Sequence, residues 1–451
     1  MSKHPFRSFY PAIIALLLIQ PIVSFGQNNH TEGSVQSSSD SLSLSSIINR
    51  IVESHPSVKQ AQEVIATAEA KIALVKSANL PEVNATGSYT RIGPVPSITI
   101  PGMGSFTMAP NNNYNLALNY NQAVYDFGKT DKSVAIESEN QNLSKQQLEQ
   151  VKQKLSLLAS NSYFSLAYLQ EALKIKDEQI RTLKEHLSFV EKKKLTGTAT
   201  EYEIVSTQVR ISNAENQKYD LEASRKIQYA VLNALLGQPD ETPIIVQNET
   251  NLKLSLPNDQ DLISSALNQR DEMKIVHEKG ALAQLQYQSA KSQNNPVVST
   301  FVSAGTKNGY VPDLNTLKLN YVAGVGIRIP IYDGARVKNN LLLINSSIQI
   351  NNLEQEITKR NISSEVVEKQ TTLLTSLKKI DHYELQLKQA EKALSLAVVS
   401  YKAGALTNLD LLDANTAVSE SRLLLLKSKI DYAVGIYNLK AAIGERLYSA
   451  K

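Results

Sequence analysis

Two stretches of the chain carry apolar residues at the spacing of helices that pack side by side. In residues 335–403 these positions are separated alternately by four and three residues, and residues 129–196 follow the same rule. Neither stretch contains a glycine or a proline. The spacing predicts two supercoiled helices, each about 100 Å long at a rise of about 1.5 Å per residue. The positions are Tyr383, Leu387, Ala390, Leu394, Ala397 and Tyr401 in the second stretch, and Ile180, Leu183, Leu187 and Val190 in the first.

Four shorter helical patterns fill much of the remaining chain. Each is about half as long as a long stretch, so two short helices laid end to end would match one long helix. They cover residues 42–80, 200–237, 259–292 and 407–443.

Segments within 82–125 and 297–332 alternate apolar or aromatic residues with small or polar ones. This period of two predicts strand hairpins with one apolar face. It suits a membrane β-barrel with a wet lumen, and it also suits a soluble antiparallel sheet with one exposed face. The apolar set includes Val83, Tyr89, Tyr114, Leu116, Leu118, Tyr120, Leu319, Tyr321, Val325 and Ile327. The segment 93–113, rich in Pro, Gly and Asn, is expected to be a long irregular loop.

Four strands cannot close a barrel, and open sheet edges are not tolerated in lipid. Three copies would supply twelve strands and would arrange the helices as a tube. The expected fold class is therefore a mixed α and β membrane protein. A long coiled-coil-like α-helical barrel would continue into a transmembrane β-barrel with four strands from each protomer of a homotrimer.

Three landmarks recur at one offset, which indicates an internal two-fold duplication. Tyr125-Asp126, Gly197 and Leu236-Gly237 return 207 residues later as Tyr332-Asp333, Gly404 and Ile443-Gly444. The predicted plan has a first structural repeat at 42–237, an equatorial linker at 238–258, a second repeat at 259–444 and a short C-terminal tail at 445–451. The long helices are expected at 129–195 and 335–402.

Residues 1–26 have the features of a cleaved signal peptide. Lys3 and Arg7 precede an apolar stretch over 10–25, which ends in small residues. Their removal would lower the net charge from +4 to +2, and so near-neutral a chain is not expected to bind nucleic acid. Residues 27–41, rich in Ser, Asn and Gln, are expected to be disordered.

The 451-residue chain contains no cysteine, which excludes disulfides and thiol chemistry. No segment after the leader approaches the roughly 20 apolar residues that a membrane helix needs. No nucleophile–base pair or metal-ligand spacing occurs, so we expect neither an enzyme nor a cofactor. The six histidines are expected to be solvated surface residues: His4, His30, His55, His186, His277 and His382.

The end of the second repeat carries the most specific motif, Tyr401-Lys-Ala-Gly404-Ala-Leu-Thr407-Asn-Leu-Asp410-Leu-Leu412-Asp413-Ala414. It resembles the tip pattern Y-x-x-G-x-x-T-x-x-D-x-L-D-A of the TolC-like outer-membrane efflux proteins. The strand exits at Tyr125 and Tyr332 and the helix ends at Gly237 and Gly444 resemble that family too. The resemblance covers essentially the whole chain after the leader.

The resemblance implies roles for residues at the tips. Asp410 and Asp413 would ring the periplasmic entrance, Tyr401 and Glu203 would tether neighbouring hairpins in the closed state, and the turns at Gly197 and Gly404 would face an adaptor. Leu406 departs from the pattern, because the family has a latching arginine there.

Two of these acids, Glu203 and Asp410, have an alternative explanation in helix capping. Thr200-x-x-Glu203 and Thr407-x-x-Asp410 have the spacing of capping boxes, so capping alone would explain Glu203 and Asp410. Asp413 has no such role. It lies one turn beyond Asp410, about 4.5 Å along the helix, and would add a second ring of carboxylates that favours cations.

The leading hypothesis is a passive, homotrimeric outer-membrane exit channel of a tripartite efflux or type I secretion system in a Gram-negative bacterium. Its partners would be outer-membrane lipid, a periplasmic adaptor (membrane fusion protein) and an inner-membrane pump. The alternative is an exported periplasmic coiled-coil scaffold or adaptor without a channel. The exported substrate is not encoded in any of these patterns.

Overall fold

The structure is a computed structural model that describes residues 41–247 and 259–449. In those ranges it has eight α-helices, a short 3-10 helix and six strands. The expected signal peptide at 1–26 and all but the last residue of the expected disordered segment lie outside the described residues. So do 248–258 of the expected linker and the last two residues of the tail.

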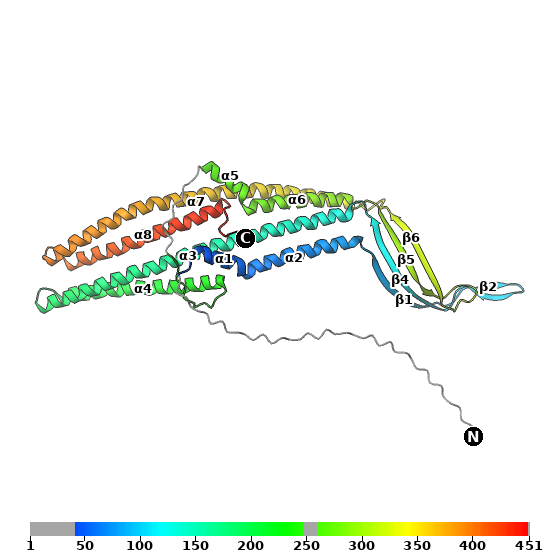
Figure 1. Ribbon diagram of the computed structural model, residues 1–451, viewed down its shortest axis with the longest axis horizontal. Helices are drawn as coiled ribbons and strands as arrows, with labels where there is room; N and C mark the ends of the chain where they lie inside the picture. The colour runs from blue at the N-terminus through cyan, green and yellow to red at the C-terminus, as the bar shows by residue number, and fades with distance from the viewer. Residues whose placement is uncertain (1–40, 248–258, 450–451) are drawn as a thin grey trace, which may run out of the picture. The chain divides into compact units, whose positions relative to one another are not determined.

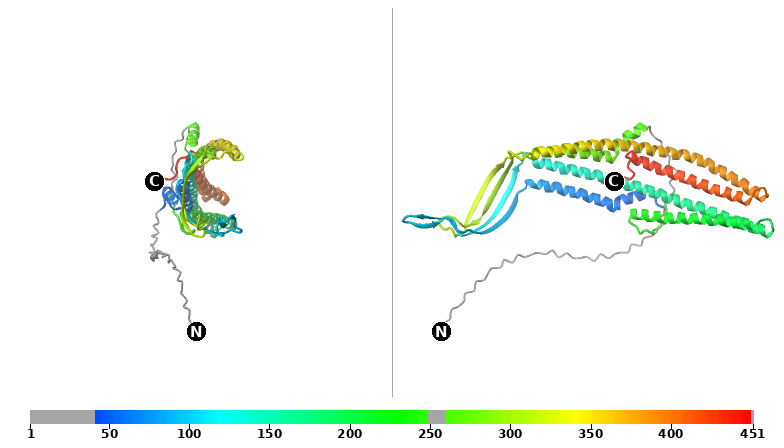
Figure 2. Two further views of the ribbon diagram at one scale, coloured as in Figure 1. Left: turned by 90° about the vertical axis from the view of Figure 1, so that its right-hand side faces the viewer. Right: turned by 180° about the vertical axis from the view of Figure 1, so that it is seen from behind.

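Two long helices run through the molecule, and shorter helices lie along them (Figure 1). They are α3 (Lys129–Leu195) and α7 (Arg336–Lys402), each of 67 residues. At their far ends the chain turns back into α4 (Glu201–Leu236) and α8 (Asn408–Ala442). The halves of α3 and α7 nearer the sheet are accompanied by α2 (Pro56–Lys76) and α6 (Asp271–Ser292). Figure 2 shows both helix turns, the tips, at the end opposite the sheet.

The helices of the described ranges include none that is long and apolar enough to span a bilayer.

The single helix expected over 42–80 is divided, and that prediction is wrong. The chain forms α1 (Leu44–Ser54), α2 and a 3-10 turn, η1 (Ser77–Asn79). The break falls at His55, because Pro56 disfavours the helical conformation of the residue before it. His55 is extended, with φ −63° and ψ 134°, and its Nδ1 accepts a hydrogen bond from the Ser57 N–H at 3.1 Å.

The helix expected over 259–292 is also divided, into α5 (Asp259–Gln269) and α6. Arg270 between them is extended, with ψ 137°. Its guanidinium binds both carboxylate oxygens of Glu272, at 2.9 and 3.0 Å, and also pairs with Glu365 of α7. No glycine or proline marks this break, so the spacing pattern did not reveal it.

The four long strands form one antiparallel sheet in the order β1-β4-β5-β6. They are β1 (Glu82–Arg91), β4 (Asn112–Tyr125), β5 (Val297–Lys307) and β6 (Lys318–Arg328). The register places Val83 opposite Tyr120 and Leu118 opposite Ala304, so the apolar positions share one face. Strands β1 and β6 are the two edges. The loop expected to be irregular contains a second hairpin, β2 (Ser97–Ile100) with β3 (Gly104–Thr107).

The largest apolar cluster lies where α1, α4 and α8 meet the middle of α3. Tyr163 and Phe164 of α3 are fully buried there, with ring centroids 5.4 Å apart in an edge-to-face arrangement. Ile244 and Val246 of the segment after α4 join this core, and Val246 forms a parallel bridge with Leu42. The Tyr163 hydroxyl donates to the Gln247 carbonyl at 2.8 Å and so holds the connecting chain against α3.

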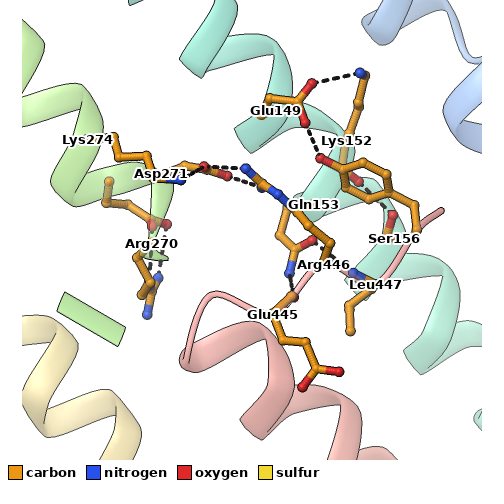
Figure 3. Close-up of polar contacts among 12 residues, drawn as sticks. Glu149, Lys152, Gln153, Ser156, Arg270, Asp271, Lys274, Glu445, Arg446 and Leu447 are labelled. Atoms are coloured by element: carbon orange, nitrogen blue, oxygen red, sulfur yellow. Dashed lines mark hydrogen bonds and ion pairs between the residues drawn. The ribbon is translucent and has the colours of Figure 1, made fainter. Parts of the chain in front are cut away.

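The segment after α8 is clamped between α3 and α6 (Figure 3). Gly444 has φ +84°, and a Cβ there would lie 2.9 Å from the backbone nitrogen of Arg270, so only glycine fits. Arg446 then makes two hydrogen bonds to Asp271, at 2.5 and 2.7 Å. Gln153 of α3 holds the same segment by donating to the Glu445 carbonyl and accepting from the Leu447 N–H.

The contact between Arg446 and Asp271 is expected to contribute to the stability of the fold. The Asp271 side chain is only 5% exposed, and Arg446→Gln would leave it with Lys274, 3.9 Å away, as its remaining ion-pair partner, so the change should lower the free energy of unfolding by about 3 kcal/mol. The control is Lys440→Gln, which breaks an exposed ion pair with Glu445 and should cost less than about 1 kcal/mol. Denaturant unfolding of the purified protein measures both. Equal losses would contradict the clamp.

Candidate functional site at the helical tips

The tips are two turns of the same construction. Gly197 ends the α3 side of one turn and Gly404 ends the α7 side of the other, both with φ +74°. Each turn is followed by a complete capping box, in which the threonine hydroxyl accepts from the N–H of the acid and the acid accepts from the threonine N–H. The pairs are Thr200 with Glu203 and Thr407 with Asp410. The prediction that Glu203 and Asp410 belong to capping boxes is therefore confirmed.

Glu203 has a second partner across the gap between the hairpins. The Tyr401 hydroxyl, at the end of α7, donates to Glu203 Oε2 at 2.8 Å, while the other carboxylate oxygen stays in the capping box. Tyr401 is 4% exposed. Burial raises the pKa of its hydroxyl, and the hydrogen bond to Glu203 raises it further, so the proton stays in place at neutral pH. Tyr401 and Glu203 thus meet within one chain.

Lysine and aromatic side chains surround this contact. The Lys193 ammonium lies 4.7 Å from the centroid of the Tyr401 ring and 5.8 Å from that of Phe189, within cation–π range. Its neighbour Lys194 pairs with Glu201 at the start of α4. Leu406, at the position of the missing arginine, packs with Tyr401 and Leu411 in a small apolar cluster.

The two aspartates have different surroundings. Asp410 is exposed, and its pKa is lowered first by the Thr407 hydroxyl, which donates to Oδ2 at 2.6 Å, and then by the Thr407 N–H. Asp413 instead pairs with Arg210 of α4 at 2.6 Å. No short-range spacing suggests this pair, because the two residues are 203 positions apart. Of these two aspartates, Asp413 therefore has an ion-pair partner within 4.0 Å among the described residues, and Asp410 has none.

His186 is a functional candidate that the sequence reading missed. It is half-buried, and its Nε2 lies 2.6 Å from Oδ1 of Asn408, so the expectation of a solvated surface histidine is wrong for this residue. Its ring also packs edge-on to Tyr401, with centroids 5.4 Å apart. One signal was available: His186 lies three residues after Leu183 and four before Val190, at the edge of the buried stripe.

No group of three or more His, Asp or Glu residues is placed to hold a metal ion anywhere in 41–247 or 259–449. The side chains of the tips join two helical hairpins within one chain.

Comparison with known proteins places the chain in a family. A family model described as outer membrane efflux protein matches residues 47–238 and 262–445. The chain therefore belongs to the outer membrane efflux protein family, whose members are channels and not enzymes.

Individual relatives are distant but nearly full length. Cation efflux system protein CusC of Escherichia coli (strain K12) is 24% identical over 416 residues, 89% of this chain and 86% of CusC. Nodulation protein T of Rhizobium leguminosarum bv. viciae is 22% identical over 398 residues, 86% and 79% of the two chains. A crystal structure of CusC matches with a TM-score of 0.75 at 20% identity, covering 89% of this chain and 92% of that one, which shows a shared fold.

Proposed function

We propose that this protein is the outer-membrane exit channel of a tripartite efflux or type I secretion system, a passive homotrimeric duct across the outer membrane and the periplasm. The observation that carries the proposal is the antiparallel sheet, which exposes an apolar face and two unpaired edges. Its partners are outer-membrane lipid, a periplasmic adaptor and an inner-membrane pump. Export of the chain through a cleaved signal peptide at 1–26 belongs to the same proposal.

No segment within 41–247 or 259–449 covers the apolar face of the sheet. Leu319, Tyr321 and Val325 of β6 are 87%, 82% and 74% exposed. So large an exposed apolar surface is unfavourable in water and suits contact with lipid. It counts against the alternative of a periplasmic scaffold, whose sheet would bury this face or carry polar residues on it.

The opposite face is polar and hydrogen-bonded. Asn119 of β4 donates to Asn84 and Thr86 of β1, at 3.1 and 3.0 Å, and accepts from Ser303 of β5 at 2.8 Å. Such a face suits a water-filled lumen. If β6 of one copy pairs with β1 of the next, three copies close a barrel of twelve strands and leave no edge in the membrane.

Equivalences between the two halves support the proposed duplication and the domain plan. The long helices have equal lengths, and α3 and α7 begin 207 residues apart, as do α4 and α8. Three-fold symmetry would then make six hairpins into one tube, with the turns at Gly197 and Gly404 available to an adaptor. The tether roles of Tyr401 and Glu203 and the entrance roles of Asp410 and Asp413 belong to this proposal.

The names of relatives support both efflux and secretion as the proposed function. One relative is a cation efflux system protein. Another, Proteases secretion protein PrtF of Dickeya chrysanthemi, is 21% identical over 305 residues, 65% of this chain and 64% of PrtF. Efflux and secretion both need a wide passive exit, so the same architecture serves either pump.

The lipid-facing assignment is tested by a charge on each face of the sheet. Leu118→Lys, on the apolar face, should destabilise the protein in lipid by about 2–4 kcal/mol near the bilayer midplane. Ser88→Lys, on the polar face, is the matched control and should leave stability nearly unchanged. Urea unfolding from phospholipid vesicles measures both variants. A detergent-free, soluble wild type, or equal effects of the two lysines, would count against the channel.

The entrance assignment is tested by removing the aspartates one at a time. Asp410→Ala should raise single-channel conductance in planar bilayers and weaken block by multivalent cations, because it removes an exposed carboxylate. Asp413→Ala should weaken the block further, because it also leaves the Arg210 charge unpaired. If conductance and block are unchanged in both variants, these residues do not line the entrance.

The tether is tested by Tyr401→Phe. Loss of a hydrogen bond to a charged acceptor is worth about 1.5–3 kcal/mol, so the ratio of open to closed channels should rise about tenfold or more while the trimer stays intact. Tyr219→Phe, at a tyrosine 63% exposed on α4, is the control and should behave as the wild type. Single-channel recordings give the ratio, and an unchanged ratio would exclude the tether.

A further inference from the structure

Asn408 is buried where a solvated residue is expected. It is the first residue of α8, directly after an exposed tip turn, yet it is only 6% exposed. The residue at the same place in the first hairpin, Glu201, is exposed and pairs with Lys194 of its own hairpin. The two tips therefore differ at this position, and only Asn408 reaches across to the other hairpin.

Both the nitrogen and the oxygen of the Asn408 carboxamide form hydrogen bonds. Its Nδ2 lies 3.3 Å from each of three oxygens on α4: the Glu203 carbonyl, Ser206 Oγ and Thr207 Oγ1. Both hydroxyls donate to the Glu203 carbonyl, so they are acceptors toward the amide. This orientation points Oδ1 at His186 of α3, and it requires a proton on Nε2 of the imidazole. One side chain thus ties the start of α8 to both helices of the first hairpin.

Packing alone does not hold His186 in this orientation. A cavity of about 340 Å³ borders its ring, together with Leu183, Phe189, Leu394, Val398 and Tyr401. The imidazole has space on that side, and the hydrogen bond to Asn408 and the edge-on contact with Tyr401 hold the ring. The position equivalent to His186 in the second hairpin, 207 residues later, is an exposed alanine, Ala393, so this contact occurs once per chain.

We propose that His186 and Asn408 form a second latch of the entrance, independent of ion pairing, in which both are positioning residues for the closed state. This inference rests on the proposed channel function. Asp410 and Asp413 lie two and five residues after Asn408 on the same helix, so the latch also sets the place of both carboxylates. Opening must break the hydrogen bond between Nε2 and Oδ1, and the loss of this bond disfavours the open state.

The latch differs from the neighbouring contacts in its response to salt. The Arg210–Asp413 pair is 35% and 58% exposed, so about 1 M salt, with a Debye length of about 3 Å, screens it strongly. A hydrogen bond between an imidazole and a carboxamide has no such dependence on ionic strength. Recordings at low and high salt therefore distinguish the ion pair from the hydrogen bond between His186 and Asn408.

The test is a set of single-channel recordings from reconstituted wild type and variants in 0.1 M and 1 M KCl. His186→Phe keeps a ring beside Tyr401 but removes the donor, and it should raise the fraction of open channels several-fold at both salt concentrations. His186→Gln supplies an amide donor and should restore most of the closed state. His382→Phe, at an exposed histidine of α7, is the matched control and should behave as the wild type.

Several outcomes would overturn the latch. Wild-type gating in His186→Phe would do so, as would equal opening in the Phe and Gln variants, which would assign the effect to ring packing. An effect that disappears in 1 M KCl would assign it to charge. If His186→Phe does not assemble, Asn408→Leu removes the same contact from α8, together with the contacts of the amide to α4, and should open the channel at least as much. A wild type that forms no channel at all would instead refute the proposed function.

Discussion

The lateral packing of α3 is the constraint on which the rest of the structure depends. A helix of 67 residues cannot bury its apolar stripe by itself and needs partners along its whole length. Helices α1, α2, α4, α6 and α8 all pack on it. They divide it into a half that leads to the sheet and a half that leads to the tips, with Tyr163 and Phe164 buried where the two halves meet. Both functional ends are therefore extensions of one shared core.

At the tips, stability within each hairpin and adhesion between hairpins come from different interactions. Each turn is closed locally by glycine and a capping box, which act over a few residues. The hairpins adhere through Tyr401 with Glu203, Arg210 with Asp413, and His186 with Asn408. These contacts are made by side chains and not by helix backbone, so in the proposed channel they could break while the helices stay folded. Glu203 belongs to both sets, because it takes part in a capping box and in the contact between the hairpins.

At the other end the sheet reverses the usual arrangement of apolar and polar surface. Its apolar face is outside and exposed, and its hydrogen-bonded polar side chains lie on the other face. In a soluble protein that arrangement would be costly, whereas in lipid it satisfies both faces once the edges are paired. In the proposed channel, a membrane would cover the apolar face and further copies of the chain would pair the edges that the protomer leaves open.

The sequence by itself determined the elements whose signals are local. Absence of glycine and proline, four-three spacing, strand alternation and the Thr-x-x-acid caps all depend on residues a few positions apart, and the long helices, the apolar sheet face and both capping boxes follow from them. Only the tertiary structure decided the break at Arg270, the pairing of Asp413 with Arg210 and the burial of His186 against Asn408. The last two depend on how helices some 200 residues apart are rotated about their axes, and the spacing along one chain does not specify that rotation.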